Sequence, residues 1–163
     1  MRYEYRVTKY DPSKRDVDGA YRVAEWTEFA HVGRRFAGRV LKKPEYLAIE
    51  RKYTEALEKF LAEAEVSHVE LRNLETAGLK VPAAKTWGRK RSLSLAEVSR
   101  FARLALRGQI WGRLTAPRRA YVHFGWDYYM YIGLSRPTPN AIAAARGAGL
   151  FVELFRSPYA RVA

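Results

Sequence analysis

Residues 121–133 read Tyr-Val-His-Phe-Gly-Trp-Asp-Tyr-Tyr-Met-Tyr-Ile-Gly, and six of these thirteen residues are aromatic. Two runs of strand-forming residues flank Gly125-Trp126-Asp127, a pattern typical of a β-hairpin with a three-residue loop. Strand side chains alternate, so this loop predicts one apolar face that packs on the core. That face would be built from three cross-strand pairs: Phe124 with Tyr128, Val122 with Met130, and Ala120 with Ile132.

The opposite face of this hairpin would carry aromatic side chains that each have a polar group: Tyr121, His123, Tyr129 and Tyr131. One interpretation is that these rings pack inside the protein and their hydroxyls find partners at an edge. The other is that the face is exposed and binds a flat or charged partner. A shift of one residue in the register would exchange the two faces. The role of the aromatic face therefore depends on whether another segment covers it.

The rest of the chain predicts a single α+β domain over residues 1–163. Pro44 suits the first turn of a helix that runs to about residue 64, and the less regular stretch before it has room for a short helix around 25–36. Strands are expected at 2–9, 67–75, 109–115, 120–124, 128–134 and 150–155. This pattern indicates a largely antiparallel sheet of about five or six strands, with two main helices and one short helix.

Two capping signals place the other helices. Ser94 and Glu97 form a capping box for a helix over 95–107. Thr138, followed by a proline, can cap a short helix that ends near Gly147 or Gly149. Residues 76–93, between the strand at 67–75 and this second main helix, are expected to form a loop.

The chain carries a net charge of +13, and the charge is unevenly distributed. Residues 1–44 have a net charge of +5, residues 45–75 of −4, and residues 76–163 of +12. A positive field of this size attracts polyanions such as nucleic acid or an acidic protein. Arg outnumbers Lys by 21 to 9, and a GC-rich coding sequence could produce much of that bias without a binding role.

Several protein classes are disfavoured by composition. There is no cysteine, which excludes disulfides and thiolate metal sites and fits a cytoplasmic protein. No run of about 18 apolar residues is present, so we expect no membrane span. The three histidines are not spaced as metal ligands are, and we expect neither a metal nor a cofactor.

The clearest basic element is the predicted helix at 95–107. Its helical spacing places Arg100, Arg103 and Arg107 in one row, opposite an apolar face. A row of guanidinium groups can bind phosphates or carboxylates, although it can equally be an ordinary solvated helix face. The other basic residues that we predict to contact a polyanion are Arg89, Lys90, Arg91, Arg118 and Arg119.

A wider resemblance covers most of the chain. It rests on the segments Lys9-Tyr10-Asp11-Pro12, Arg15-Asp16, Asp18-Gly19-Ala20-Tyr21, Glu25-Trp26-Thr27 and Gly125–Gly133. Together these segments resemble a family of small uncharacterised bacterial proteins. The resemblance implies a single-domain bacterial cytoplasmic protein, and it implies no activity.

Three functions remain open from the residues alone. The first is a non-catalytic protein that binds a polyanion, above all nucleic acid, through its basic C-terminal half and the aromatic hairpin face. The second is an immunity or antitoxin-like protein that neutralises an acidic protein partner. The third is an enzyme that cleaves phosphodiesters, with His123 and Asp127 as its weak candidate acid–base residues.

Overall fold

The computed structural model describes residues 1–76, 78, 80–88 and 92–161. Its sheets contain β1 (Tyr3–Thr8), β2 (Arg35–Phe36), β3 (Arg39–Val40), β4 (His68–Glu75), β5 (Ser92–Ser94), β6 (Trp111–Ala116), β7 (Ala120–Phe124), β8 (Met130–Leu134) and β9 (Phe151–Leu154). Its α-helices are α1 (Lys43–Glu63), α2 (Pro82–Trp87), α3 (Leu95–Leu106) and α4 (Pro139–Gly147). Short 3₁₀ turns are η1 (Pro12–Lys14), η2 (Phe29–His31), η3 (Trp126–Tyr128) and η4 (Pro158–Arg161).

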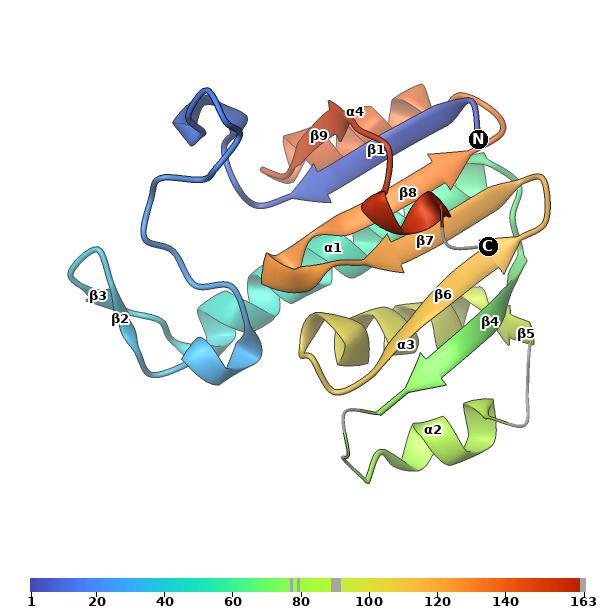
Figure 1. The fold of residues 1–163 in the computed structure, drawn as a ribbon, viewed down its shortest axis with the longest axis horizontal. Helices are drawn as coiled ribbons and strands as arrows, with labels where there is room; N and C mark the ends of the chain where they lie inside the picture. Colours follow the sequence, from blue (N-terminus) through green and yellow to red (C-terminus); the bar gives the residue numbers. More distant parts are fainter. Residues whose placement is uncertain (77, 79, 89–91, 162–163) are drawn as a thin grey trace.

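One seven-stranded sheet organises the domain. Its strand order is β5-β4-β6-β7-β8-β1-β9, and every neighbouring pair is antiparallel. Helices α1, α3 and α4 cover one face of this sheet, and α1 contacts both of the others (Figure 1). The strands β2 and β3 form a separate small hairpin. The α+β prediction is confirmed, with more strands than expected.

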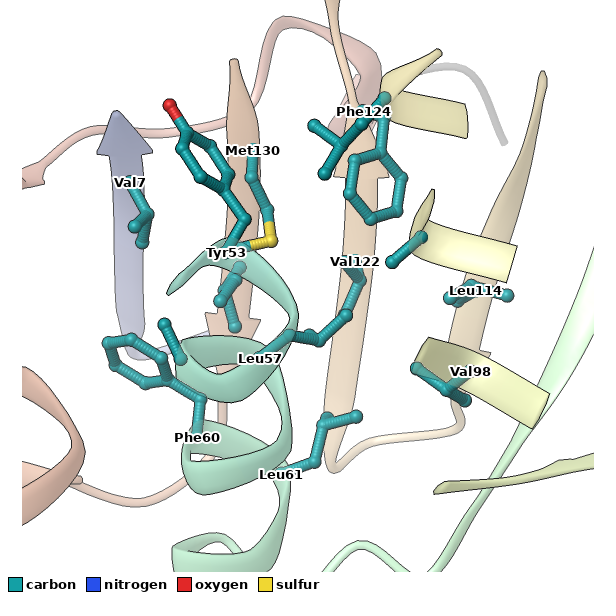
Figure 2. Packing of buried hydrophobic residues seen from close by; sticks show 14 of the residues in the cluster. Val7, Tyr53, Leu57, Phe60, Leu61, Val98, Leu114, Val122, Phe124 and Met130 are labelled. Atoms are coloured by element: carbon teal, nitrogen blue, oxygen red, sulfur yellow. The ribbon is translucent and has the colours of Figure 1, made fainter. Parts of the chain in front are cut away.

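The core lies between the sheet and the helix layer. Strand side chains from β1, β6, β7 and β8 meet Tyr53, Leu57 and Leu61 of α1 and Val98 of α3 (Figure 2). The apolar hairpin face that the sequence predicts is buried here, and its members are Ala120, Val122, Phe124, Tyr128, Met130 and Ile132. Strand alternation therefore sorts the β7–β8 hairpin into two faces as predicted.

The predicted register of the hairpin is wrong by two residues. Phe124 pairs with Met130 and Val122 pairs with Ile132, whereas the three-residue loop would have paired Phe124 with Tyr128. The connection is longer than predicted, and it is closed by a hydrogen bond from Gly125 N to Tyr129 O (2.9 Å). Because side chains alternate with a period of two, a two-residue shift leaves every residue on its predicted face.

Two regions contain elements that the sequence pattern missed. The expected loop at 76–93 includes α2 and β5, and β5 pairs with β4 at the edge of the sheet. The expected helix around 25–36 is only the turn η2, followed by the β2–β3 hairpin. Gly33 and Gly38 have φ values of +91° and +79° there, in the left-handed region that interrupts a right-handed helix.

One of the two expected caps forms as predicted. Ser94 and Glu97 make the capping box of α3. Thr138 makes no side-chain capping bond at α4. The carboxylate of Glu63, at the end of α1, instead accepts hydrogen bonds from Asn140 N (3.2 Å) and Ala141 N (2.7 Å). A negative group at the start of a helix is favourable, so α1 supplies the cap of α4.

The sheet is closely packed at Gly133 of β8. This glycine pairs with Tyr121 of β7, and the Tyr121 ring lies over it. A Cβ atom at position 133 would overlap the Tyr121 ring. The ring of Tyr121 also stacks on His123, with 4.6 Å between the ring centroids. Glycine is needed here because an aromatic side chain occupies the space of its missing Cβ.

We expect Gly133→Ala to destabilise the protein by about 1–3 kcal/mol, the usual cost of overpacking a core. Alanine otherwise suits a strand better than glycine, so the sign of the effect reports the overlap with Tyr121. Gly147→Ala is the control, because a Cβ atom there meets nothing within 4 Å. Urea unfolding measures both variants. A Gly133→Ala cost that persists unchanged in a Tyr121→Ala background would contradict this account.

Candidate functional site

The aromatic hairpin face is buried rather than exposed. Tyr121, His123 and Tyr131 keep 8%, 4% and 6% of their surface, and Tyr129 is half-buried. The cover is the C-terminal segment 155–161, whose turn η4 lies on the face of the sheet opposite to α1 and α3 (Figure 1). The hairpin is thus covered on both sides.

Specific contacts hold the C-terminal segment in place. The hydroxyl of Ser157 lies 2.8 Å from Nδ1 of His123. The ring of Tyr159 lies edge-on to the rings of His123 and Tyr131, with 6.1 Å between centroids in each pair. The hydroxyl of Tyr121 donates a 2.7 Å hydrogen bond to Glu4, and burial raises the pKa of this hydroxyl. These aromatic residues hold the fold together and are not free to stack on a partner.

His123 is uncharged at neutral pH. Burial, followed by the nearby positive charge of Arg113, lowers the pKa of His123 to about 4. A neutral imidazole cannot serve as a cation for a phosphate group. It can still hydrogen bond, and its Nδ1 is occupied by Ser157.

Beside the C-terminal segment lies a cavity of about 310 Å³, the arginine cavity. Its polar lining residues include Glu4, Arg113, Thr115, Arg118, His123 and Arg156. Arg113 pairs with His123 across β6 and β7, which sets both side chains on this face. The hydroxyl of Thr115 is buried and has no hydrogen-bond partner among the residues that the structure describes.

Further arginines lie at the same end of the sheet as the arginine cavity but do not line it. The N-terminal strand, the β6–β7 turn and the β8–α4 connection meet there, through hydrogen bonds from Arg2 N to Leu134 O and from Ser135 N to Arg119 O. We define the basic sheet end as Arg2, Arg113, Arg118, Arg119, Arg136 and Arg156. In the part of the chain that the structure describes, two carboxylates form ion pairs with three of these arginines. Glu65 lies 3.9 Å from Arg119 and 2.5 Å from Arg136, and Glu4 lies 3.9 Å from Arg156.

The three arginines of the predicted row on α3 do not share one environment. Arg100 and Arg103 are exposed. Arg107 instead makes two 2.7 Å hydrogen bonds to the buried carboxylate of Glu50, which raise the pKa of Arg107. This ion pair ties α3 to α1 and gives Arg107 a structural role. The row also lies on the helix side of the sheet, away from the arginine cavity (Figure 1).

The other predicted site residues fall into three groups. Arg118 and Arg119 belong to the basic sheet end. Arg89, Lys90 and Arg91 lie outside the described residues. His123 and Asp127, the candidate acid–base pair, line two different cavities and are not brought together in either.

A second and larger cavity lies where the β7–β8 turn, the α3–β6 turn and residues 27–28 meet. It has a volume of about 490 Å³, and we call it the aromatic cleft. Trp111, Phe124, Trp126 and Tyr128 contribute to its walls, and Glu28, Glu75 and Asp127 are also lining residues. Tyr159 borders both cavities, so they adjoin at the C-terminal segment.

Among the described residues, no three His, Asp or Glu side chains gather to form a metal site. No helix in the described part of the chain is both long and apolar enough to cross a membrane. The chain matches no family model, no curated protein and no solved structure. The resemblance to small bacterial proteins therefore stays a prediction.

Sequence reasoning missed part of this site. Arg113 could have been found, since alternation along 109–115 places it on the face of His123 once the two strands pair. Arg2 and Arg156 could not, because they flank β1 and β9, which pair with each other from opposite parts of the sequence. Arg136 could not, because its ion-pair partner Glu65 is distant in sequence. Tyr159 follows the last predicted strand and has no periodic pattern around it.

The titration of His123 gives a test of its burial. In the unfolded chain a histidine takes up a proton near its usual pKa of 6.5. In the folded protein His123 does so only at its lowered pKa of about 4. The unfolded state therefore binds more protons between these values, and stability falls by up to about 3 kcal/mol as pH drops from 6.5 to 4. His123→Asn removes this titration and keeps a polar group facing Ser157.

We expect the stability advantage of the native chain over His123→Asn to shrink as pH falls from 7 to 4.5. Urea unfolding at each pH measures both proteins, and acidic side chains affect both alike. A stability difference that does not change with pH would show that His123 titrates normally and is not buried as described.

Proposed function

We propose that the protein is a non-catalytic binding protein for a polyanion, and that this polyanion is nucleic acid. The observation that carries the proposal is the arginine cavity at the basic sheet end, where Arg113, Arg118 and Arg156 line one space and Glu4 is the one carboxylate among the described lining residues. The net charge of +13 adds a long-range attraction for the same kind of partner.

The chemistry of the cavity suits a phosphate group. Guanidinium groups bind phosphate oxygens through paired hydrogen bonds, which makes arginine the preferred residue for this contact. Thr115 adds a hydroxyl that has no hydrogen-bond partner among the described residues. A volume of about 310 Å³ is at the small end for ligand sites, and it suits one phosphate with part of its sugar.

The buried aromatic face sets the mode of binding. Tyr121, His123 and Tyr131 are covered by the C-terminal segment and cannot stack on bases in this structure. Contacts to phosphates position a protein on nucleic acid and carry no sequence information. We therefore infer binding through the phosphate backbone, with little dependence on base sequence.

Fluorescence anisotropy with labelled oligonucleotides of mixed sequence, measured across salt concentrations, tests this proposal. Replacing Arg118 and Arg156 together by Gln should weaken binding at least about tenfold at low salt and reduce the salt slope by about 2. Both side chains are exposed, so the fold should survive. The control replaces Arg51 and Lys59 by Gln, which removes the same charge from exposed positions of α1.

Equal losses in the two double variants would mean that net charge alone, and not the basic sheet end, controls binding. An absence of binding at about 50 mM salt would contradict the nucleic-acid proposal. In that case the acidic protein partner of an immunity-like function becomes the candidate for the same arginines. Capture by the native chain, but not by Arg118→Gln/Arg156→Gln, would identify such a partner.

A further inference from the structure

The aromatic cleft differs in charge from the rest of this basic protein. Its lining residues include the carboxylates of Glu28, Glu75 and Asp127. None of the lining residues that the structure describes is Lys, Arg or His. Such a site repels phosphate and attracts a cation. The aromatic cleft and the arginine cavity therefore do not form one continuous phosphate-binding site.

Three basic residues adjoin or contact lining residues of the cleft, but none of them is itself a lining residue. Arg107 precedes the lining residue Gly108, and its guanidinium group is paired with Glu50. Arg113 lies 5.8 Å from the centroid of the Trp111 ring, but it lines the arginine cavity and not the cleft. His31 lies 3.2 Å from Glu28, whose side chain is still more than half exposed. The carboxylates therefore give the cleft its charge.

Aromatic residues form much of the wall. Trp126 keeps 83% of its surface exposed, a larger fraction than any other aromatic residue among the described residues. Trp111, Phe124 and Tyr128 lie around the same space. Aromatic faces attract organic cations, and the attraction is strongest for tryptophan. Carboxylates with aromatic walls favour a cation that also has an apolar body.

The turn that presents Trp126 is held in a costly backbone conformation. Asp127 and Tyr128 both have positive φ values, +61° and +68°, which is rare for a bulky residue such as tyrosine. The Tyr128 ring is anchored in the core, edge-on to Trp26 and Tyr53 at 5.0 Å between centroids. This anchor restrains the turn that carries Trp126 and Asp127, and both of these residues line the cleft.

We propose that the aromatic cleft binds a small organic cation of the quaternary ammonium type. The cation lies against Trp126 and its charge is balanced by the cleft carboxylates. A volume of about 490 Å³ accommodates a ligand of this size. The site is separate from the basic sheet end, so the polyanion and the organic cation bind to different surfaces of the protein.

Choline is the probe, and 3,3-dimethylbutan-1-ol is its neutral isostere. In an NMR titration of ¹⁵N-labelled protein, choline should shift the indole N–H signals of Trp126 and Trp111 and saturate in the millimolar range, about 1–20 mM. The isostere has the same shape without the charge, and it should bind several-fold more weakly. Equal binding of choline and the isostere would overturn the proposal, as would the absence of any saturable shift.

Three variants locate the site. Trp126→Ala should weaken choline binding by about threefold or more, because it removes an exposed aromatic contact. Asp127→Asn removes the charge, and asparagine tolerates a positive φ, so the turn is preserved. The Asp127→Asn variant should also weaken choline binding, whereas Glu45→Gln on the exposed surface of α1 should not.

Unchanged choline binding in both cleft variants would contradict the proposal. The Arg118→Gln/Arg156→Gln variant should bind choline normally.

Discussion

Burial of both faces of the β7–β8 hairpin is the constraint on which the rest of the structure depends. All ten residues of these two strands are buried, five in each strand. One face packs against α1 and α3, and the other lies under the C-terminal segment. A strand that is covered on both sides needs a partner for every polar group that it carries. Tyr121 and His123 meet this need through Glu4 of β1 and Ser157 of the C-terminal segment, so the hairpin joins the two ends of the chain.

This arrangement also explains where the candidate sites lie. The C-terminal segment covers the centre of the sheet and leaves a cavity on either side of Tyr159. The arginine cavity collects charge from the ends of strands that are distant in sequence. The aromatic cleft collects residues from turns and is acidic. Two neighbouring cavities of opposite charge favour two different ligands, which a net charge of +13 does not reveal.

Sequence patterns predicted the features that depend on local periodicity. The two faces of the hairpin, the helix α1 and the capping box of α3 all follow from spacing within one element. The register of the β7–β8 hairpin does not follow from spacing, because a loop of three residues and a loop of five leave the same residues on each face. The cover formed by Ser157 and Tyr159 could not be predicted, since its contacts with His123 and Tyr131 join residues at least 28 positions apart. The pairing of Arg107 with Glu50 was missed for the same reason, as these residues lie 57 positions apart.

The number of arginines in the chain and the places where they gather have different causes. A compositional bias raises the number of arginines, but it does not decide where they gather. Arg6 and Arg15 both bind Glu153, and Arg107 binds Glu50, so these three serve the fold. Burial alone would raise the pKa of Glu153, but the hydrogen bonds from Arg6 and Arg15 lower it, which shows how fully these charges are used internally. The basic sheet end differs, because three arginines, Arg113, Arg118 and Arg156, line one cavity there, and Glu4 is the one carboxylate among its described lining residues. Guanidinium groups that line one cavity repel each other, and the bound anion that we propose would balance their charge.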